Sequence, residues 1–225
     1  MARILNLETA TTNCSVSISE GKNIVCLKEN NATSYSHSEQ LHVFIKEALD
    51  EASLTFLDLD AIAVSKGPGS YTGLRIGVSA AKGLCFSLDL PLISVPTLQS
   101  MAYQIKVADG EVVIPVLDAR RMEVYSSVFD HNFDEIRETR AEIIAEGSFD
   151  DYNSFQKVHI VGSGAEKCQE TLNRDNFHFN TELFPSAKEM ALISFKKFQE
   201  NAFEDVAYFE PYYLKDFVMQ TKKSS

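Results

Sequence analysis

The chain has 225 residues, of which 44% are hydrophobic and 24% charged, and its formal net charge is −11 at pH 7. This length can bury a core in one large domain or in two small lobes. A protein that binds nucleic acid alone needs concentrated Lys and Arg, and the sequence has no basic cluster longer than a pair such as Lys222-Lys223. If RNA is involved, we expect another subunit to supply the cationic surface.

The cysteines and the apolar runs restrict the class of protein further. Cys14, Cys26, Cys85 and Cys168 are far apart and form no CxxC pair, which fits reduced thiols better than a disulfide framework or a zinc site. The start MARILNLETA resembles no cleavable leader, and no apolar run approaches the ~20 residues of a membrane span. We expect a cytoplasmic protein that does not enter a membrane.

The first sixty residues predict a strand meander followed by a helix. Apolar runs at 3–7, 14–18 and 24–28 are separated by polar turns, which is typical of antiparallel strands. The sequence SHSE at 36–39 fits a capping box for an amphipathic helix over about 38–53. His37 and His42 lie five residues apart rather than the four that zinc helices use, so we interpret them as solvent-facing or interface histidines.

The stretch 61–88, AIAVSKGPGSYTGLRIGVSAAKGLCFSL, is the most informative part of the chain. It predicts a buried strand at 61–64, a glycine-rich turn, and a helix over 71–88 that Ser70 or Thr72 caps. Gly73 and Gly77 fall inside this helix, where each glycine costs about 0.5–1 kcal/mol relative to alanine. Close approach of another backbone would explain them.

The remaining pattern predicts two related halves. A strand at 91–95, a helix opened by Pro96-Thr97 and a turn at 108–110 complete the first half. Strands at 112–117 and 124–129 around a polar turn, and a strand at 158–161 before glycines, repeat the first half in degenerate form. Residues 133–155 are mostly polar, with one helix or strand at 141–145, and a helix opens at Ser186. We predict a two-lobed mixed α/β protein, with lobes 1–108 and 109–225 and the second eroded.

Four segments, taken in chain order, resemble one family. ILNLETATTNCSVSI, GPGSYTGLRIG, VIPVLDARRMEVYSSVF and EPYYLK are similar to segments of the TsaB (YeaZ) family, relatives of the glycoprotease-like (M22) TsaD or Gcp proteins. The resemblance implies a duplicated actin/Hsp70/sugar-kinase fold (ASKHA, ribonuclease H-like). It also implies a non-catalytic dimerisation subunit that activates a TsaD-type threonylcarbamoyltransferase in the synthesis of tRNA threonylcarbamoyladenosine (t6A37).

The helices 38–53 and 71–88 are predicted to form a paired face for a partner. The alternative is that helix 71–88 packs only on its own sheet, where glycine also permits close approach. The predicted interface residues are Leu41, Phe44, Tyr71, Leu74, Arg75, Gly77, Val78, Ala81, Leu84 and Cys85. The resemblance implies a TsaD-like transferase as partner, a TsaE-like ATPase docked on the pair, a homodimer when the transferase is absent, and tRNA contact only through the complex.

The polar and glycine turns are candidates for a vestigial nucleotide site. In nucleotide-binding relatives, acidic residues after the first strand of each half would orient a metal-bound phosphate, and turn amides would receive phosphate oxygens. The candidates are Glu8, Thr9, Gly67, Pro68, Gly69, Ser70, Asp118, Gly162 and Gly164. The alternative is inherited scaffolding, since Asp and Gly are common in turns. We expect no metal or cofactor on the isolated chain, and ATP or ADP with Mg²⁺ or another metal only in the complex.

Independent catalysis is disfavoured by one departure from TsaD. TsaD-type proteins carry an HxxxH metal pair on the helix that corresponds to residues 96–106, and this segment contains no histidine. Two enzyme hypotheses stay open: a kinase or ATPase acting alone through Glu8, Asp118 and the glycine turns, and a glycoprotease-like hydrolase centred on Ser70. Ser70 does not lie in a GxSxG elbow.

Overall fold

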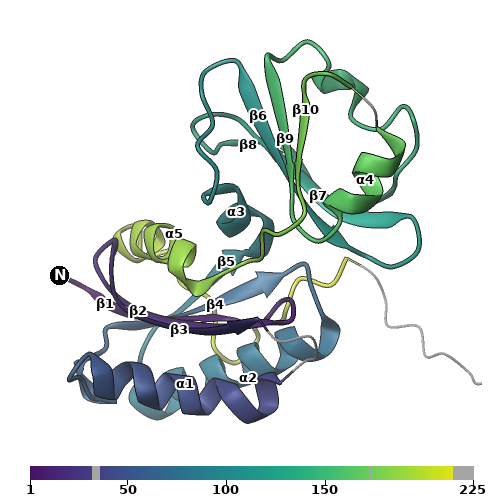
Figure 1. The fold of residues 1–225 in the computed structure, drawn as a ribbon. Coiled ribbons are helices and arrows are strands. Elements are labelled where there is room, and N and C mark those ends of the chain that lie inside the picture. Colours follow the sequence, from purple (N-terminus) through teal and green to yellow (C-terminus); the bar gives the residue numbers. More distant parts are fainter. Residues whose placement is uncertain (32–35, 173, 215–225) are drawn as a thin grey trace, which may run out of the picture.

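The computed structural model describes residues 1–31, 36–172 and 174–214. Within these residues the chain forms two lobes, each built on a five-stranded mixed sheet (Figure 1). The predicted α/β class and the two-lobed organisation are therefore confirmed. Phe217 and the basic pair Lys222-Lys223 lie outside the described residues.

The first sheet begins with the predicted meander. Its strands are β1 (Arg3–Glu8), β2 (Asn13–Glu20), β3 (Asn23–Asn31), β4 (Ala61–Gly67) and β5 (Leu92–Pro96). They stand in the order β3-β2-β1-β4-β5, with the first three antiparallel and β1, β4 and β5 parallel. Residues 61–64 form the first part of β4 as predicted, and the strand continues through Lys66 to Gly67.

Helices cover both faces of this sheet (Figure 1). Helices α1 (His37–Glu51) and α2 (Tyr71–Leu88) lie on one face, and α5 (Ala187–Gln199) lies on the other. Ser70 caps α2 by accepting a hydrogen bond from the amide of Gly73. The predicted capping box of α1 is wrong, because the hydroxyl of Ser36 makes no capping bond.

The second sheet repeats the first. Its strands are β6 (Glu111–Asp118), β7 (Glu123–Phe129), β8 (Glu135–Ile143), β9 (Lys157–Val161) and β10 (Phe177–Asn180). The order β8-β7-β6-β9-β10 matches β3-β2-β1-β4-β5 in both succession and direction, so the predicted duplication is confirmed. The sheet is complete, and erosion affects the helices. Where α1 and α2 stand in the first lobe, the described residues of the second form only the 3-10 turn η2 (Asp150–Tyr152) and the seven-residue α4 (Ala165–Thr171).

The two halves exchange helices. Helix α3 (Thr97–Ala102) comes from the first half, yet Leu98 and Met101 pack with Val113 and Phe129 of the second sheet. Helix α5 comes from the second half, and its apolar side packs on the first sheet. The predicted second lobe of 109–225 is therefore wrong at its C-terminal end. The reason is that the first sheet has a second apolar face, on which Ala187, Met190 and Ile193 of α5 pack.

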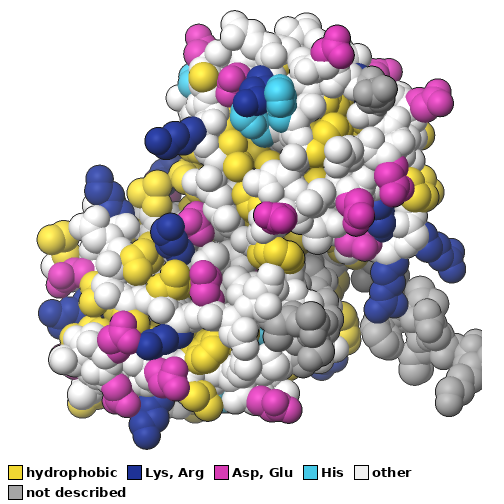
Figure 2. Space-filling view, viewed as in Figure 1, with side chains coloured by type: hydrophobic (Ala, Val, Ile, Leu, Met, Phe, Trp, Pro, Cys, Tyr) yellow, Lys and Arg dark blue, Asp and Glu magenta, His cyan; other side chains and the backbone are white. Residues whose placement is uncertain are grey.

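The surface is chemically mixed. On the face seen in Figure 2, acidic side chains are spread over both lobes, and Lys and Arg stand between them rather than in one continuous field. None of the helices in the described part of the chain is long and apolar enough to cross a membrane.

Candidate functional site

The turn that joins β1 to β2 explains Gly73 and Gly77 of α2, and Gly69 just before the helix. A Cβ atom on Gly69 or Gly73 would lie 2.4 Å from the carbonyl oxygen of Ala10 or 2.2 Å from that of Thr9, and a Cβ on Gly77 would lie 2.3 Å from Oγ1 of Thr9. Another backbone does approach closely, as predicted. It belongs to the same chain, however, so these glycines give no support to a partner surface.

Six of the ten predicted interface residues face the first sheet rather than solvent. They are Leu41, Leu74, Gly77, Val78, Ala81 and Cys85, all buried in the core of the first lobe. The prediction is wrong for these six because apolar and small residues at helical spacing marked the inner side of each helix. Phe44 and Leu84 pack partly against the same core, Tyr71 is partly buried and Arg75 is exposed. For these four, a partner contact stays a prediction.

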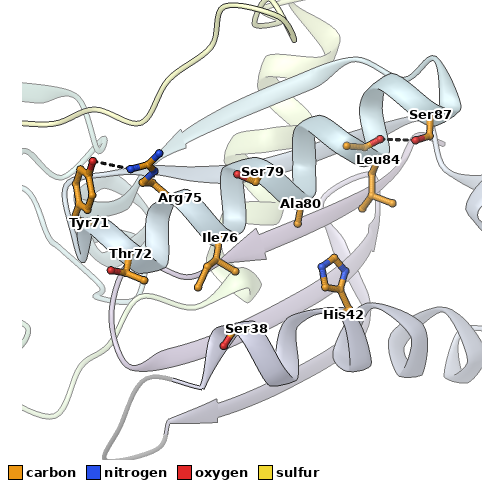
Figure 3. Close-up of a pocket in the computed structure, with 11 residues that line it drawn as sticks. Ser38, His42, Tyr71, Thr72, Arg75, Ile76, Ser79, Ala80, Leu84 and Ser87 are labelled. Carbon is orange, nitrogen blue, oxygen red and sulfur yellow. Dashed lines mark hydrogen bonds between the residues drawn. The ribbon is translucent and has the colours of Figure 1, made fainter.

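An open groove runs along the outer side of the helix pair (Figure 3). Ile76, Ala80 and Leu84 point from α2 toward α1, where His42 and Ser38 line the opposite wall. The groove has a volume of about 820 Å³. The other lining residues are Tyr71, Thr72, Arg75, Ser79, Gly83 and Ser87. A sequence signal for this groove existed: the exposed positions of α2 repeat at helical spacing, offset from the buried ones.

Gly83 differs from the other glycines of α2. A Cβ atom there would meet nothing within 4 Å, so no neighbour in this chain requires a glycine. Its carbonyl oxygen accepts a hydrogen bond of 2.7 Å from the hydroxyl of Ser87. At the other end of the groove, Arg75 donates to the hydroxyl of Tyr71 at 2.8 Å (Figure 3). The groove thus has a floor of small residues, apolar walls and a cationic end.

The two histidines of α1 have different environments. His42 is exposed and lines the groove, which agrees with the prediction. His37 is only 1% exposed, so the prediction of a solvent-facing or interface residue is wrong for it. Its Nε2 lies 2.6 Å from the carbonyl oxygen of Thr11, and burial lowers its pKa. His37 therefore fixes α1 to the β1–β2 turn.

The candidate nucleotide residues of the first lobe are engaged within the chain. The amide of Ala10 donates to Oε1 of Glu8, the amide of Thr9 donates to Oγ of Ser65, and the amide of Ser70 donates to the carbonyl of Ala10. Glu8 is fully buried, and burial raises its pKa to about 7. Among the described residues, Oε2 of Glu8 has no hydrogen-bond partner. These three amides therefore already have acceptors within the chain.

The matching residues of the second lobe are engaged as well. Asp118 pairs with Lys167 at 2.5 Å and accepts from the amide of Arg120, and its own amide donates to Ser163. Gly162 has φ of +114°, and a Cβ there would lie 2.4 Å from the carbonyl oxygen of Val116. A Cβ on Gly164 would lie 2.9 Å from Val124. Packing and turn geometry account for both glycines, and a nucleotide site at these turns stays a prediction.

Comparison with known proteins assigns the family. The family model described as TsaD, tRNA N6-adenosine threonylcarbamoyltransferase, matches residues 31–224. The tRNA threonylcarbamoyladenosine biosynthesis protein TsaB of Escherichia coli is 29% identical over 98% of this chain and 97% of its own. The TsaB of Buchnera aphidicola subsp. Schizaphis graminum is 30% identical over 86% of this chain and 93% of its own. The chain belongs to the TsaB (YeaZ) family.

Solved structures agree with this family at the level of the fold. YeaZ from Pseudomonas aeruginosa matches 95% of this chain and 100% of its own, with a TM-score of 0.81 at 23% identity. The activator of 2-hydroxyisocaproyl-CoA dehydratase from Clostridium difficile, solved with bound ADPNP, matches 89% of this chain and 96% of its own, with a TM-score of 0.50 at 9% identity. The predicted ASKHA-type fold is confirmed, and this TsaB-family chain is a protein of tRNA t6A modification.

Two chemical features of the TsaB-family chain bear on the enzyme hypotheses. The hydroxyl of Ser70 accepts the capping bond from Gly73, so it serves the helix start. Across the described residues, no group of three or more His, Cys, Asp or Glu side chains is arranged to hold a metal ion.

Proposed function

We propose that this chain is the non-catalytic docking subunit of the t6A machinery. The groove between α1 and α2 binds the corresponding helices of a TsaD-type transferase and holds that enzyme in its active geometry. When the transferase is absent, a second copy of the chain occupies the groove. A TsaE-type ATPase docks on the pair, and tRNA is contacted through the complex.

The observation that carries this proposal is the open groove itself. It combines apolar walls from Ile76 and Leu84 with a floor at Gly83 that no residue of this chain fills. Two helices from a partner, laid on α1 and α2, would form a four-helix contact of the standard interface size, about 1,200–2,000 Å² in total. The strongly acidic composition supports contact with tRNA through partners, because phosphate binding needs concentrated cations.

Nucleotide and metal enter this proposal only through the partners. The turn amides around Glu8 and Asp118 already donate within the chain, which supports an isolated chain that binds neither ATP nor Mg²⁺. Titration calorimetry of the purified chain with ATP and magnesium separates this proposal from the kinase or ATPase hypothesis. Binding at micromolar concentration would favour the enzyme.

Gly83→Arg is the sharpest test of the groove. Because the position is open, the arginine is tolerated by the fold and fills the groove. We expect the affinity for the cognate TsaD-type subunit to fall at least tenfold, measured by titration calorimetry, with an unchanged circular dichroism spectrum. Substitutions at Gly77 or Val78 are unsuitable, because both residues are buried and would report on folding.

A matched control uses the second lobe. Ile136→Arg introduces the same charge at an exposed position of β8, and we expect wild-type affinity. If Gly83→Arg also binds the transferase as tightly as the wild type, the groove is not the docking site and the proposal is wrong.

A further inference from the structure

The segment 204–213, here called the C-terminal strap, crosses the first lobe beside α2. It starts at β5, where the amide of Glu204 donates to the carbonyl of Leu92 at 2.8 Å. It reaches the end of β4, where the amide of Tyr212 donates to the carbonyl of Lys66 at 2.7 Å. Between these ends, Val206 and Phe209 pack against the core of the first lobe. The strap is thus attached at both ends.

One side chain of α2 holds the middle of the strap. The ammonium group of Lys82 donates to the carbonyl oxygens of Ala207 at 3.1 Å and Phe209 at 2.9 Å. An ammonium group has three donors, so one lysine can bind two carbonyl oxygens of nearby residues at the same time. Lys82 therefore joins α2 to the strap through two hydrogen bonds. It fixes the distance between the strap and the helix.

A second hollow of about 370 Å³ lies between α2 and the strap. It shares Tyr71, Arg75 and Ser79 with the groove between α1 and α2, so the two hollows form one continuous surface around Arg75. The strap contributes Tyr213, whose ring lies 5.0 Å from that of Tyr71 between centroids. The guanidinium of Arg75 lies 5.2 Å from the centroid of the Tyr71 ring. An exposed arginine therefore stands beside two tyrosines at the junction of the two hollows.

We propose that the strap is the second wall of the docking surface, and that Lys82 is the positioning residue that holds it there. This inference rests on the proposed function, because the occupant is the same TsaD-type partner. A carboxylate on the surface of that partner pairs with Arg75, beside the rings of Tyr71 and Tyr213. Charge supports this chemistry, because the second hollow is lined by two cations, Arg75 and Lys82, and one carboxylate, Glu210. Arginine and tyrosine are also the residues that most often anchor protein interfaces.

Lys82→Met tests the positioning role. Methionine keeps an unbranched stem but cannot bind the two carbonyls, so we expect faster amide hydrogen exchange across 204–213 and at least tenfold weaker binding of the TsaD-type subunit. Lys82→Arg retains donors for both carbonyls, and we expect it to restore affinity to within about threefold of the wild type. Lys22→Met, in the exposed β2–β3 turn, is the matched control and should bind normally.

Arg75→Gln tests the charge of the occupant. If a carboxylate of the partner meets Arg75, the variant binds about tenfold more weakly and its affinity depends less on salt than that of the wild type. An unchanged salt dependence would overturn the ionic contact.

The outcomes separate this inference from the proposed function. Faster exchange in the strap of Lys82→Met with unchanged affinity would overturn the strap as a docking wall, and so would a Lys82→Arg variant as weak as Lys82→Met. If Gly83→Arg abolishes binding while Lys82→Met binds normally, the groove is the docking site and the strap is not. If Gly83→Arg binds normally, both proposals fail.

Discussion

Gly73→Ala is expected to destabilise the protein, whereas Gly83→Ala, the same substitution ten residues later in the same helix, is expected to stabilise it. A Cβ on Gly73 would lie 2.2 Å from the carbonyl oxygen of Thr9, which belongs to the backbone and cannot rotate away. Overpacking of this kind costs about 1–3 kcal/mol. A Cβ on Gly83 meets nothing, so the substitution gains the helix preference of alanine, about 0.5–1 kcal/mol.

Urea unfolding followed by circular dichroism measures both effects. Each variant is compared with the wild type at one pH, and the free energies of unfolding are taken from the linear extrapolation. Equal stability changes of the same sign in the two variants would show that the β1–β2 turn does not constrain α2.

Glu8→Gln is expected to remove a loss of stability that the wild type suffers as pH rises. Burial raises the pKa of Glu8 from its ordinary value of 4.5 to about 7. Below pH 4.5 the carboxyl is protonated in both the folded and unfolded states. Between pH 4.5 and about 7, Glu8 is protonated in the folded state and ionised in the unfolded state, so the free energy of unfolding falls as pH rises. At about 1.4 kcal/mol per tenfold change in proton affinity, the loss reaches roughly 3 kcal/mol above pH 7.

The measured quantity is the difference in the free energy of unfolding between the wild type and Glu8→Gln. Free energies of unfolding of wild type and Glu8→Gln are recorded from pH 4.5 to 8, and their difference should change by roughly 3 kcal/mol in favour of the variant. The lowered pKa of His37 acts in both proteins and cancels in the difference. A difference that is constant with pH would mean that Glu8 has the same pKa in the folded and unfolded states, so that burial does not raise it.

Much of the fold was predictable because periodicity reports burial directly. The alternation at 14–18 predicted a strand of the first meander, and the helix predicted over about 71–88 agrees with α2. The repeat of strand, polar turn and strand predicted the duplication, since both sheets need the same apolar runs. Strand β8 was only partly predicted, because its charged sequence pairs with β7 through the backbone and leaves many side chains in solvent.

The candidate site was harder to predict for a physical reason. Small and apolar residues at helical spacing mark the side of α2 that meets the sheet, and Val78 and Ala81 lie there. The groove instead lies on the other side, where Ile76, Ser79 and Gly83 repeat at helical spacing but mix apolar, polar and small side chains. Sequence alone also cannot tell which backbone requires a glycine: Gly73 and Gly77 meet the β1–β2 turn, and Gly83 meets nothing.

The exchange of helices between the halves has a consequence for protein engineering. Helix α3 closes the second sheet and α5 closes the first, so a cut between residues 103 and 110 leaves each fragment with a bare apolar sheet face. Neither fragment can cover its exposed apolar sheet face by itself, because the helix that covers it belongs to the other fragment. The turn at 108–110 is therefore a natural place to divide the chain into a split reporter, whose signal depends on the two fragments meeting.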